Sequence, residues 1–525
     1  MGDGSWTVDF YDFAAELAEL DGELAGFGDV HERAVGNGAR NGTPVIVHEA
    51  GRVDARVNLF FRTGAMAGSR PSTWRRYAYA LVVWLEFLAA FGRSWDQATA
   101  GDVEAFKDWR LTDRGNDGRV APTSFDTDRA ALNSFYRWAA ARHGIANPVP
   151  TVPARAGRRP GGGRAGHGWG VRDGLRPASA SRRQVKWMLR PAFEQWRDVG
   201  LRGYGFDGLR RAGWRGGGCE DRDAAFVDGL YGAGLRLAEW ASVLDVELPA
   251  ASGGRFPRAW LSAACAKGGR HGRFYRIPRG VLSAVEAYLD PAEGSRQLAV
   301  ERAQRAGRYQ RLRGLRIVTG YNPRTRMLCL AGESEATPTR VDVLGPDERR
   351  LLFRRTPRGL EPLAVWLTPG GMPKKAHGWE DTFAAANARV QRAWQASGGH
   401  GEAVLFCRPH MCRHSFALKW FSILSVAWEH RIEGFTAEEV KDLRDIFGDL
   451  WFQLASLLGH ADPAVTRDIY LEPFCALRVD YLMSLLDEEE KTGVDALVRA
   501  VAADSGRVLT GPTPGGGGHG ADGAR

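Results

Sequence analysis

The sequence is poor in cysteine and contains no long apolar run. Its six cysteines are spread irregularly over 525 residues, so they do not form the disulfide framework of a small secreted domain. No apolar run reaches the roughly 18 residues of a membrane-spanning helix, and the N-terminus lacks the basic-then-apolar pattern of a secretion signal. These absences exclude a disulfide-stabilised scaffold and a helical membrane protein, and we expect a cytoplasmic protein.

Acidic residues are scarce in one segment of the chain. Residues 151–218 hold fifteen lysines and arginines against four acids, a net charge of +11 in a chain whose total is +9. A basic band of this kind is typical of a protein that binds a polyanion such as DNA, although a solvated arginine-rich linker has the same composition. The candidate contacts are Arg155, Arg158, Arg159, Arg182, Arg183 and Lys186.

The length and an ordinary hydrophobic content of 44% predict two or three domains with buried cores. Residues 1–55 form an N-terminal arm in which we read no chemistry. Its apolar residues at helical spacing predict a helix, and residues 44–47 predict a strand. The residues of that expected helix are Phe10, Phe13, Leu17, Leu20 and Leu24.

Residues 56–150 are predicted to form a small helical domain. The first helix would begin at an N-cap on Ser72 or Thr73, and the second at Thr99 with Asp102 completing a capping box. The third ends before Pro148. The expected core residues of the three helices are Trp74, Tyr77, Leu81, Trp84, Leu85, Leu88, Val103, Phe106, Trp109, Ala131, Phe135, Trp138 and Ala139.

The remaining chain divides by composition. We predict a basic Gly/Pro linker, a main domain interrupted twice and a partly disordered tail. These are residues 151–180, residues 181–490 with extra segments at about 291–400 and 429–449, and residues 491–525. In the first extra segment, short apolar runs predict strands at 315–318, 327–330, 341–344 and 363–367.

Six polar residues outside these apolar patterns define the candidate chemistry. Arginine forks clamp phosphoryl oxygens bidentately, whereas acyl or sugar chemistry usually requires carboxylates. Two arginines, a lysine and two histidines therefore favour phosphoryl transfer, and a tyrosine supplies a nucleophile. In chain order the six are Arg236, Lys267, His410, Arg413, His460 and Tyr470.

The local sequence indicates how these residues are presented. Gly232 and Gly234 allow a tight turn before a helix, which places Arg236 near a helix N-terminus. Pro409 suits the first turn of a helix on which the histidine and arginine three residues apart share one face. Lys267 would lie in a glycine-rich hairpin turn, and Gly459 would end the helix before His460.

Other interpretations of these residues stay open. Each basic residue alone could be a solvated surface side chain, and Arg270 or Arg273 competes with Lys267 for the same role. A zinc site is disfavoured because residues two apart on a helix cannot converge on one ion. The cysteine and histidine cluster concerned is Cys407, His410, Cys412 and His414.

The ordered series resembles the tyrosine recombinases, or phage-type integrases. The matching stretches are Gly-Leu-Arg-Leu-Ala-Glu at 234–239, Ala-Lys-Gly-Gly-Arg at 266–270, His-Met-Cys-Arg-His at 410–414, Leu-Gly-His at 458–460 and Asp-Ile-Tyr at 468–470. The tyrosine follows the last histidine by ten positions, where many members of the family have nine and others ten. The helical residues 56–150 are similar to the core-binding domain of this family.

The resemblance implies a mainly α fold with a small β-sheet or hairpin. A helical core-binding domain would precede a mixed α+β catalytic domain, here with an inserted β-rich element. Tyr470 would be the nucleophile, and the other five residues would hold the phosphate and move protons. Arg270 and Arg273 would also contact DNA.

The implied partners are double-stranded DNA attachment sites, with four copies in the synaptic complex and a monomer or dimer when free. DNA-bending accessory proteins would assist, and no metal, cofactor or membrane is expected. Two other classes remain: a type IB topoisomerase or telomere resolvase with the same residues, and a DNA-binding protein with degenerate chemistry. The separate core-binding domain favours recombination.

Overall fold

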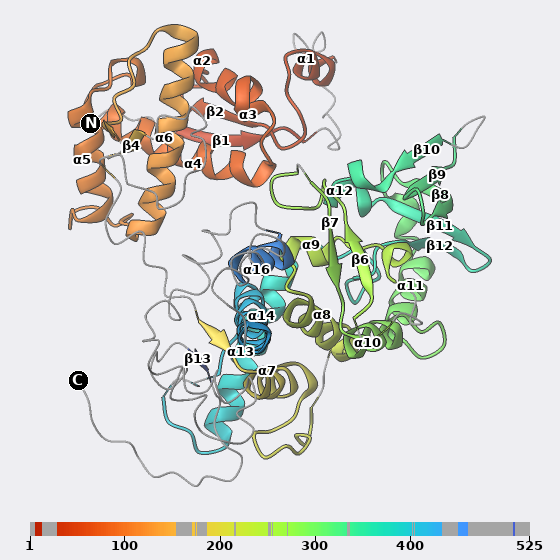
Figure 1. Ribbon diagram of the computed structural model, residues 1–525. Coiled ribbons are helices and arrows are strands. Elements are labelled where there is room, and N and C mark those ends of the chain that lie inside the picture. The colour runs from red at the N-terminus through yellow and green to blue at the C-terminus, as the bar shows by residue number, and fades with distance from the viewer. Residues whose placement is uncertain are drawn as a thin grey trace. The chain divides into compact units, whose positions relative to one another are not determined.

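A computed structural model describes most of the chain (Figure 1). The described residues are 6–12, 29–153, 171–173, 175, 186–214, 217–249, 254, 256–269, 271–332, 337–401, 403, 405–432, 450–459 and 508–509. The chain divides into two compact units, residues 1–183 and 184–525. Each unit has its own apolar core.

The first unit is mainly helical, as predicted. Its helices are α1 (Val30–Gly36), α2 (Ala55–Leu59), α3 (Gly64–Ala67), α4 (Pro71–Ala90), α5 (Ala100–Leu111) and α6 (Pro122–His143). The indole of Trp84 donates a hydrogen bond of 2.9 Å to the hydroxyl of Tyr136, which donates one of 2.7 Å to the carbonyl of Trp95. These bonds join α4 to α6 inside the core and satisfy the polar atoms of its buried aromatic residues.

The predicted start of α4 was wrong, whereas that of α5 is confirmed. Helix α4 begins at Pro71 after an extended Arg70, so Ser72 and Thr73 lie inside its first turn. Proline is favoured at this place because its fixed φ is helical and its missing N–H needs no acceptor. Thr99 and Asp102 form the expected capping box, in which the Thr99 amide donates to Asp102 at 2.8 Å.

The N-terminal arm contributes a two-stranded sheet to the same core. Strand β1 (Trp6–Phe10) pairs antiparallel with β2 (Pro44–His48), so the predicted strand at 44–47 is confirmed and Phe10 lies in a strand, where we expected a helix. The other residues of that expected helix lie outside the described residues. Ile46 exchanges backbone hydrogen bonds of 2.7 and 2.9 Å with the buried side chain of Asn58, which fixes the sheet on α2.

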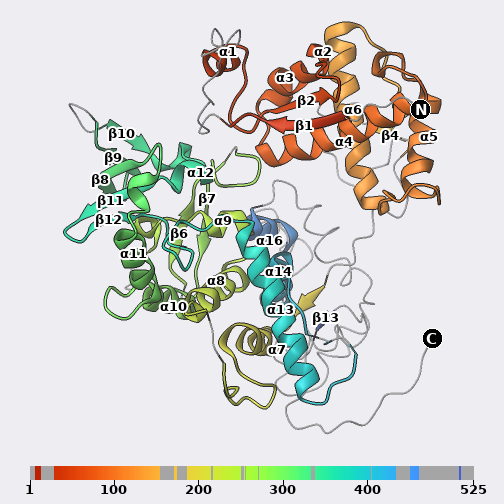
Figure 2. The ribbon, with the colours of Figure 1, turned by 180° about the vertical axis from the view of Figure 1, so that it is seen from behind.

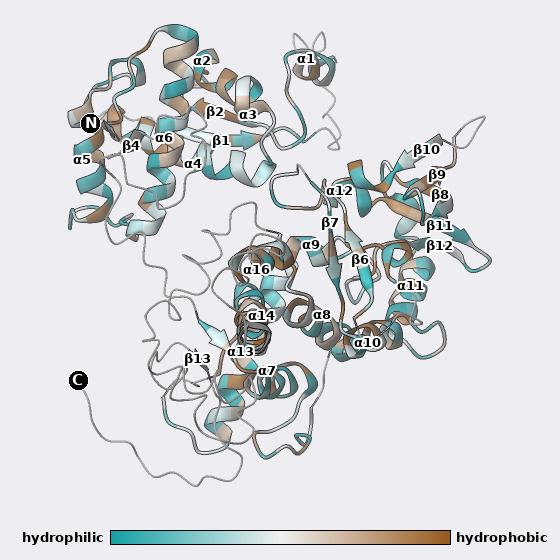
Figure 3. Cartoon of the chain, viewed as in Figure 1, coloured by the Kyte–Doolittle hydropathy of each residue, from teal (hydrophilic) through white to brown (hydrophobic). Residues whose placement is uncertain are grey.

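The second unit is built around helix α8 (Glu220–Ala233), which is buried along most of its length. The helices α9, α10 and α14 and a π-helical turn at Asp198–Arg202 pack on it. The bounds are β5 (Trp187–Met188), α7 (Arg190–Arg197), α9 (Leu237–Ala241), α10 (Arg279–Leu289), α13 (Gly378–Ala396), α14 (Pro409–Ile432) and α16 (Leu450–Leu458). Figure 3 shows both polar and apolar residues on α10, as expected for a helix that covers a core on one side.

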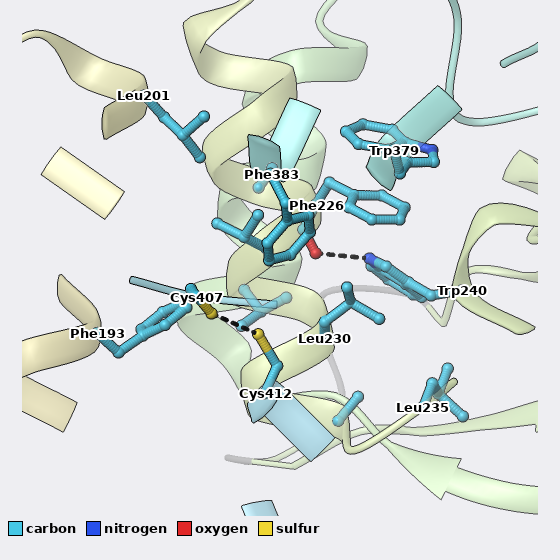
Figure 4. Close-up of a cluster of buried hydrophobic side chains, with 14 of the residues drawn as sticks. Phe193, Leu201, Phe226, Leu230, Leu235, Trp240, Trp379, Phe383, Cys407 and Cys412 are labelled. Carbon is cyan, nitrogen blue, oxygen red and sulfur yellow. Dashed lines mark hydrogen bonds between the residues drawn. The ribbon is translucent and has the colours of Figure 1, made fainter. Parts of the chain in front are cut away.

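Aromatic side chains lock these helices together (Figure 4). Phe226 of α8 stacks on Trp379 of α13 with ring centroids 3.4 Å apart. The indole of Trp240 in α9 donates to the carbonyl of Phe226 at 3.0 Å, and the indole of Trp366 donates to the carbonyl of Trp240 at 2.9 Å. Helix α9, which follows Arg236, is therefore fixed on the central helix.

A five-stranded sheet is inserted between α10 and α13, with the strand order β10-β9-β8-β11-β12. The strands are β8 (Arg316–Asn322), β9 (Met327–Leu330), β10 (Thr337–Arg340), β11 (Leu352–Thr356) and β12 (Gly359–Pro362). The helices α11 (Ser295–Arg305) and α12 (Pro346–Arg349) lie in the same segment of the chain. Neighbouring strands are antiparallel except β8 and β11. Figure 2 shows this sheet from behind, beside the hairpin of β6 (Arg258–Leu261) and β7 (Arg273–Arg276).

Two of the four strands predicted in this segment are confirmed, at 315–318 and 327–330. Residues Val341–Val343 form a 3-10 turn, and residues 363–367 are a buried segment with single bridges from Ala364 to Leu244 and from Leu367 to Pro373. Val341 and Leu344 of the first run are buried, as is most of the second, and a short apolar run does not by itself distinguish a strand from another buried segment.

The predicted fold class, mainly α with small sheets and an inserted β-rich element, is confirmed. The short pairs β3 (Thr151–Pro153) with β4 (Val171–Asp173) and β13 (Val508–Leu509) with β5 complete the described strands. Among the described residues, no helix is both long and apolar enough to span a bilayer.

Candidate functional site

A buried carboxylate, Glu239, gathers the first two predicted site segments. It lies in α9, and Arg236 lies just before that helix, so the pair occupies neighbouring turns. Glu239 accepts hydrogen bonds from the Arg236 guanidinium at 2.9 Å and from its backbone N–H at 3.0 Å. It also accepts from Arg273 of β7 at 2.7 Å and from the backbone N–H of Lys267 at 3.5 Å. The turn before α9 and the β6–β7 hairpin thus share one acceptor.

The charge of Glu239 is maintained by its partners. Burial alone would raise its pKa, but the positive charges and hydrogen bonds of Arg273 and Arg236 outweigh that effect and lower the pKa to about 2. Its side chain is only 1% exposed, whereas those of Arg236 and Arg273 are 18% and 15% exposed. The carboxylate is therefore ionised at neutral pH and holds the arginines in fixed positions.

Arg413 links the same turn to the end of α16. It lies in the first turns of α14, which begins at Pro409 as predicted, and it is fully buried. Its guanidinium donates to the carbonyl of Gly234 and, at 2.6 Å, to the carbonyl of Leu458. Both are carbonyls near helix ends, where intrahelical partners are lacking. Arg413 therefore fixes the residues just before Arg236 and just before His460.

Two glycines make this close approach feasible. Gly234 (φ +64°) ends α8, and a Cβ there would lie 2.3 Å from the ring of Phe416. Gly459 (φ +68°) ends α16, and a Cβ there would lie 2.3 Å from Nε of Arg273. A side chain at either position would be strained and would displace its neighbour. The chain preceding His460 consequently lies directly against the Arg273 guanidinium.

The turn that carries Lys267 is held by the inserted sheet as well. The indole of Trp260 in β6 donates to Asp342 at 2.7 Å, and the backbone N–H of Ala264 donates to the carbonyl of Asp342 at 3.2 Å. Arg326, just before β9, also pairs with Asp342 at 3.0 Å and lies over the indole ring. The Lys267 side chain is exposed, and Gly268 and Gly269 follow it with positive φ.

The predicted stretch 410–414 holds one exposed and one buried candidate residue. His410 lies in the first turn of α14 and is exposed, with its ring 5.9 Å from that of His414. Cys407 and Cys412 are buried with their sulfur atoms 3.6 Å apart (Figure 4), and burial raises the pKa of Cys407 well above its usual value. Within the described residues, no group of three His, Cys, Asp or Glu side chains is arranged to hold a metal.

The structure thus brings together Arg236, Arg413, the Lys267 turn and the residue before His460. His460 and Tyr470 lie outside the described residues, as do Arg155, Arg158, Arg159, Arg182, Arg183 and Arg270. Lys186 is described, and its ammonium group lies 5.0 Å from the centre of the Phe406 ring.

Sequence reasoning missed the shared role of Glu239 and Arg273. The spacing of Arg236 and Glu239 is a readable signal, because residues three apart in a helical turn lie on one face. The pairing of Glu239 with Arg273 joins positions 34 residues apart. No local pattern encodes that contact, since it depends on how the hairpin docks.

Comparison with known families identifies the first unit. Residues 58–143, which contain α3 to α6, match the family of the phage integrase N-terminal SAM-like domain. Residues 58–143 are therefore similar to the SAM-like domain of phage integrases. The resemblance to the tyrosine recombinases is thereby confirmed, and it now rests on a domain that contains none of the six predicted site residues. The curated proteins contain no significant match to this chain.

The comparison with solved structures gives matches to two recombinases and a transposon integrase. XerH bound to its difH substrate, in a post-cleavage complex, is 12% identical and aligns over 82% of this chain and 83% of its own, with a TM-score of 0.41. The Tn1549 transposon integrase in complex with circular intermediate DNA is 14% identical and aligns over 82% of this chain and 98% of its own, with a TM-score of 0.41. XerA recombinase is 12% identical and aligns over 84% of this chain and 100% of its own, with a TM-score of 0.28.

Proposed function

We propose that this chain is a site-specific DNA recombinase that cuts and rejoins strands through a 3′-phosphotyrosine at Tyr470. The observation that carries this proposal is the convergence of Arg236, Arg413 and the Lys267 turn with Gly459, the residue before His460. The match of residues 58–143, earlier in the chain, to an integrase SAM-like domain supports the proposal independently. The biological role would be integration or excision of a mobile element.

In the proposed reaction, the phenolic oxygen of Tyr470 attacks a DNA phosphorus, and the bond from phosphorus to the 5′ oxygen breaks. His410 assists removal of the tyrosine proton, and its exposed place at the start of α14 leaves it accessible to DNA. Lys267 gives a proton to the leaving 5′ oxygen. The covalent intermediate stores the bond energy, so that a 5′-hydroxyl of another strand reseals it without ATP.

Arg236 and Arg413 would stabilise the negative charge of the transition state, and His460 would bind the phosphate or position Tyr470. Arg413 donates to the carbonyls of Gly234 and Leu458, and these contacts hold its guanidinium in a fixed position before DNA arrives. Preorganised donors of this kind are typically worth about 3–4 kcal/mol each in the transition state. The buried Glu239 keeps Arg236 oriented in the same way.

The proposed partners are double-stranded attachment sites, bound by four copies in synapsis and by a monomer or dimer when free. The basic residues of 151–218 would contact phosphates, and accessory proteins would bend the DNA. A location on DNA in the cytoplasm belongs to the same proposal. The phosphate contacts in this band would be Arg155, Arg158, Arg159, Arg182, Arg183 and Lys186, and Arg270 of the β6–β7 hairpin would add another.

The test is covalent capture on a nicked suicide duplex. The sequence of the duplex is taken from the DNA that flanks the coding region. When the protein cleaves next to the nick, the short fragment that carries the 5′-hydroxyl dissociates, so the strand cannot be resealed and the covalent intermediate accumulates. We expect a DNA-linked species on denaturing gels that protease removes. Tyr470→Phe should bind the duplex as well as the wild type and form none, because only the nucleophilic oxygen is lost.

Two controls separate the alternatives. Tyr481→Phe, a second tyrosine of the same C-terminal region, should still form the adduct. An adduct that persists in Tyr470→Phe would overturn the assignment of the nucleophile, and DNA binding without any adduct in the wild type would favour a degenerate DNA-binding protein. Relaxation of a supercoiled plasmid without exchange between two sites would favour a topoisomerase.

A further inference from the structure

We infer that Arg273 is a positioning residue that keeps the phosphate site cationic by offsetting the charge of Glu239. This inference rests on the proposed function and deepens it. Arg273 lies at the start of β7, six residues after Lys267, and its guanidinium pairs with Glu239 at 2.7 Å. Its action would pass through the carboxylate that it shares with Arg236.

The contacts show how the three groups share their charge. The guanidinium of Arg273 places Nη2 2.7 Å from one oxygen of Glu239 and Nη1 3.5 Å from the other. Arg236 bonds the same two oxygens through its side chain and its backbone. Two guanidinium groups and one carboxylate leave a net positive charge of one. Without Arg273, the carboxylate would neutralise Arg236 alone, and the pair would present no net charge to a phosphate.

The buried Nε atom of Arg273 indicates that this residue is there for its charge. Its Nε is buried and has no hydrogen-bond acceptor among the described residues. A buried donor without a partner costs free energy, and an apolar side chain of similar length would avoid that cost. A guanidinium at this place, against the backbone of Gly459, is therefore better explained by its electrostatic effect on Glu239 and Arg236 than by packing.

A double-mutant cycle tests the inference. The variants are Arg273→Ala, Glu239→Gln and the two combined, with Arg273→Lys as the conservative change. The rate measured is single-turnover cleavage of the nicked duplex at saturating protein, and DNA affinity is measured separately. Arg276→Ala is the matched control, because Arg276 lies on the same strand, is exposed and donates to the backbone carbonyl of Phe256, away from Glu239.

We expect Arg273→Ala to slow cleavage by roughly tenfold or more, a size typical of coupled neighbours, with a much smaller change in affinity. Arg273→Lys should recover part of the rate. The combined variant should cleave faster than Arg273→Ala alone, because removing the carboxylate restores the net positive charge. A merely structural arginine would show neither recovery, and equal losses with and without Glu239 would overturn the inference.

A second measurement does not depend on cleavage. Arg273→Ala leaves Glu239 with Arg236 alone, so the pKa of Glu239 should rise towards its usual value and stability should fall at a higher pH than in the wild type. An unchanged acid-unfolding profile would contradict the charge coupling even if the enzyme cleaves DNA. A wild type that never forms the DNA adduct, combined with the expected pH shift, would instead reject the proposed function and retain the electrostatic pairing.

Discussion

The indole of Trp260 donates a hydrogen bond of 2.7 Å to Asp342, and this contact fastens the inserted sheet to the hairpin that carries Lys267. Asp342 also accepts from Arg326 at 3.0 Å, and the Arg326 guanidinium lies 4.4 Å from the centre of the indole ring. The carboxylate thus bridges the hairpin and the turn between β8 and β9. The inserted sheet is therefore a support for the candidate site and not an independent appendage of the fold.

Asp342→Ala should loosen this hairpin. Both Trp260 and Arg326 lose their acceptor, so backbone amides of 258–276 should exchange with solvent faster, and cleavage should slow several-fold because the lysine turn is less well placed. Hydrogen exchange with mass-spectrometric readout measures the first effect. Arg324→Ala, an exposed residue of the same β8–β9 turn, is the control. If amide hydrogen exchange in the hairpin is unchanged in Asp342→Ala, the inserted sheet does not support the hairpin through Asp342.

Arg349→Met should destabilise the second unit by about 3–5 kcal/mol, the usual cost of leaving one member of a buried ion pair alone. Arg349 is 3% exposed and donates to Glu247 at 2.6 Å, as well as to the carbonyls of Val341 and Leu344. Chemical denaturation measures the loss. Adding Glu247→Leu should recover part of the stability, because the unpaired carboxylate is then removed. A double variant as unstable as the single would contradict this account.

Arg413→Lys should lose activity although it keeps the positive charge. A lysine has no fork, so it cannot reach the carbonyls of Gly234 and Leu458 together, and about 1–3 kcal/mol of stability should be lost for the abandoned acceptor. Adduct formation should fall a hundredfold or more. Arg408→Lys, an exposed change just before α14, should have little effect on either. A cleaving Arg413→Lys variant would remove Arg413 from the proposed clamp.

The ionisation of Glu239 predicts a specific acid dependence of stability. Its pKa falls from an ordinary 4.5 to about 2 in the folded chain, so its stabilising effect is complete above about pH 4.5 and is lost as the pH falls towards 2. Integrated over that window, the shift is worth about 3 kcal/mol. Glu239→Gln should be less stable at neutral pH, and its difference from the wild type should shrink in that window. Parallel pH profiles would refute the assignment.

Lys267→Ala should be rescued by a duplex whose bridging 5′ oxygen is replaced by sulfur. A thiolate leaves without a general acid, so the variant should cleave this substrate much faster than ordinary DNA. Arg413→Ala should gain little, because its loss falls on the charge of the phosphate. If sulfur substitution instead rescues Arg270→Ala or Arg273→Ala and leaves Lys267→Ala slow, the general acid is that neighbouring arginine of the hairpin.

The sequence alone determined the helical first unit, the capping box at Thr99, two strands of the insertion and the ordered series of six polar residues. These features are local: apolar spacing sets which face of a helix is buried, and turn residues set where an element ends. The same local information indicated that α14 begins at Pro409, next to His410. It also placed Arg236 near the N-terminus of a helix, which the structure shows to be α9.

Only the tertiary structure decided how distant segments share Glu239, Arg413 and Asp342. Arg413 reaches a carbonyl 179 residues earlier in the chain, and Trp260 reaches a carboxylate 82 residues later. Such contacts follow from the packing of α8, α14 and the inserted sheet, and no periodicity in the sequence records them. The runs at 341–344 and 363–367 were mistaken for strands for the same reason, because burial depends on the neighbours that the fold supplies.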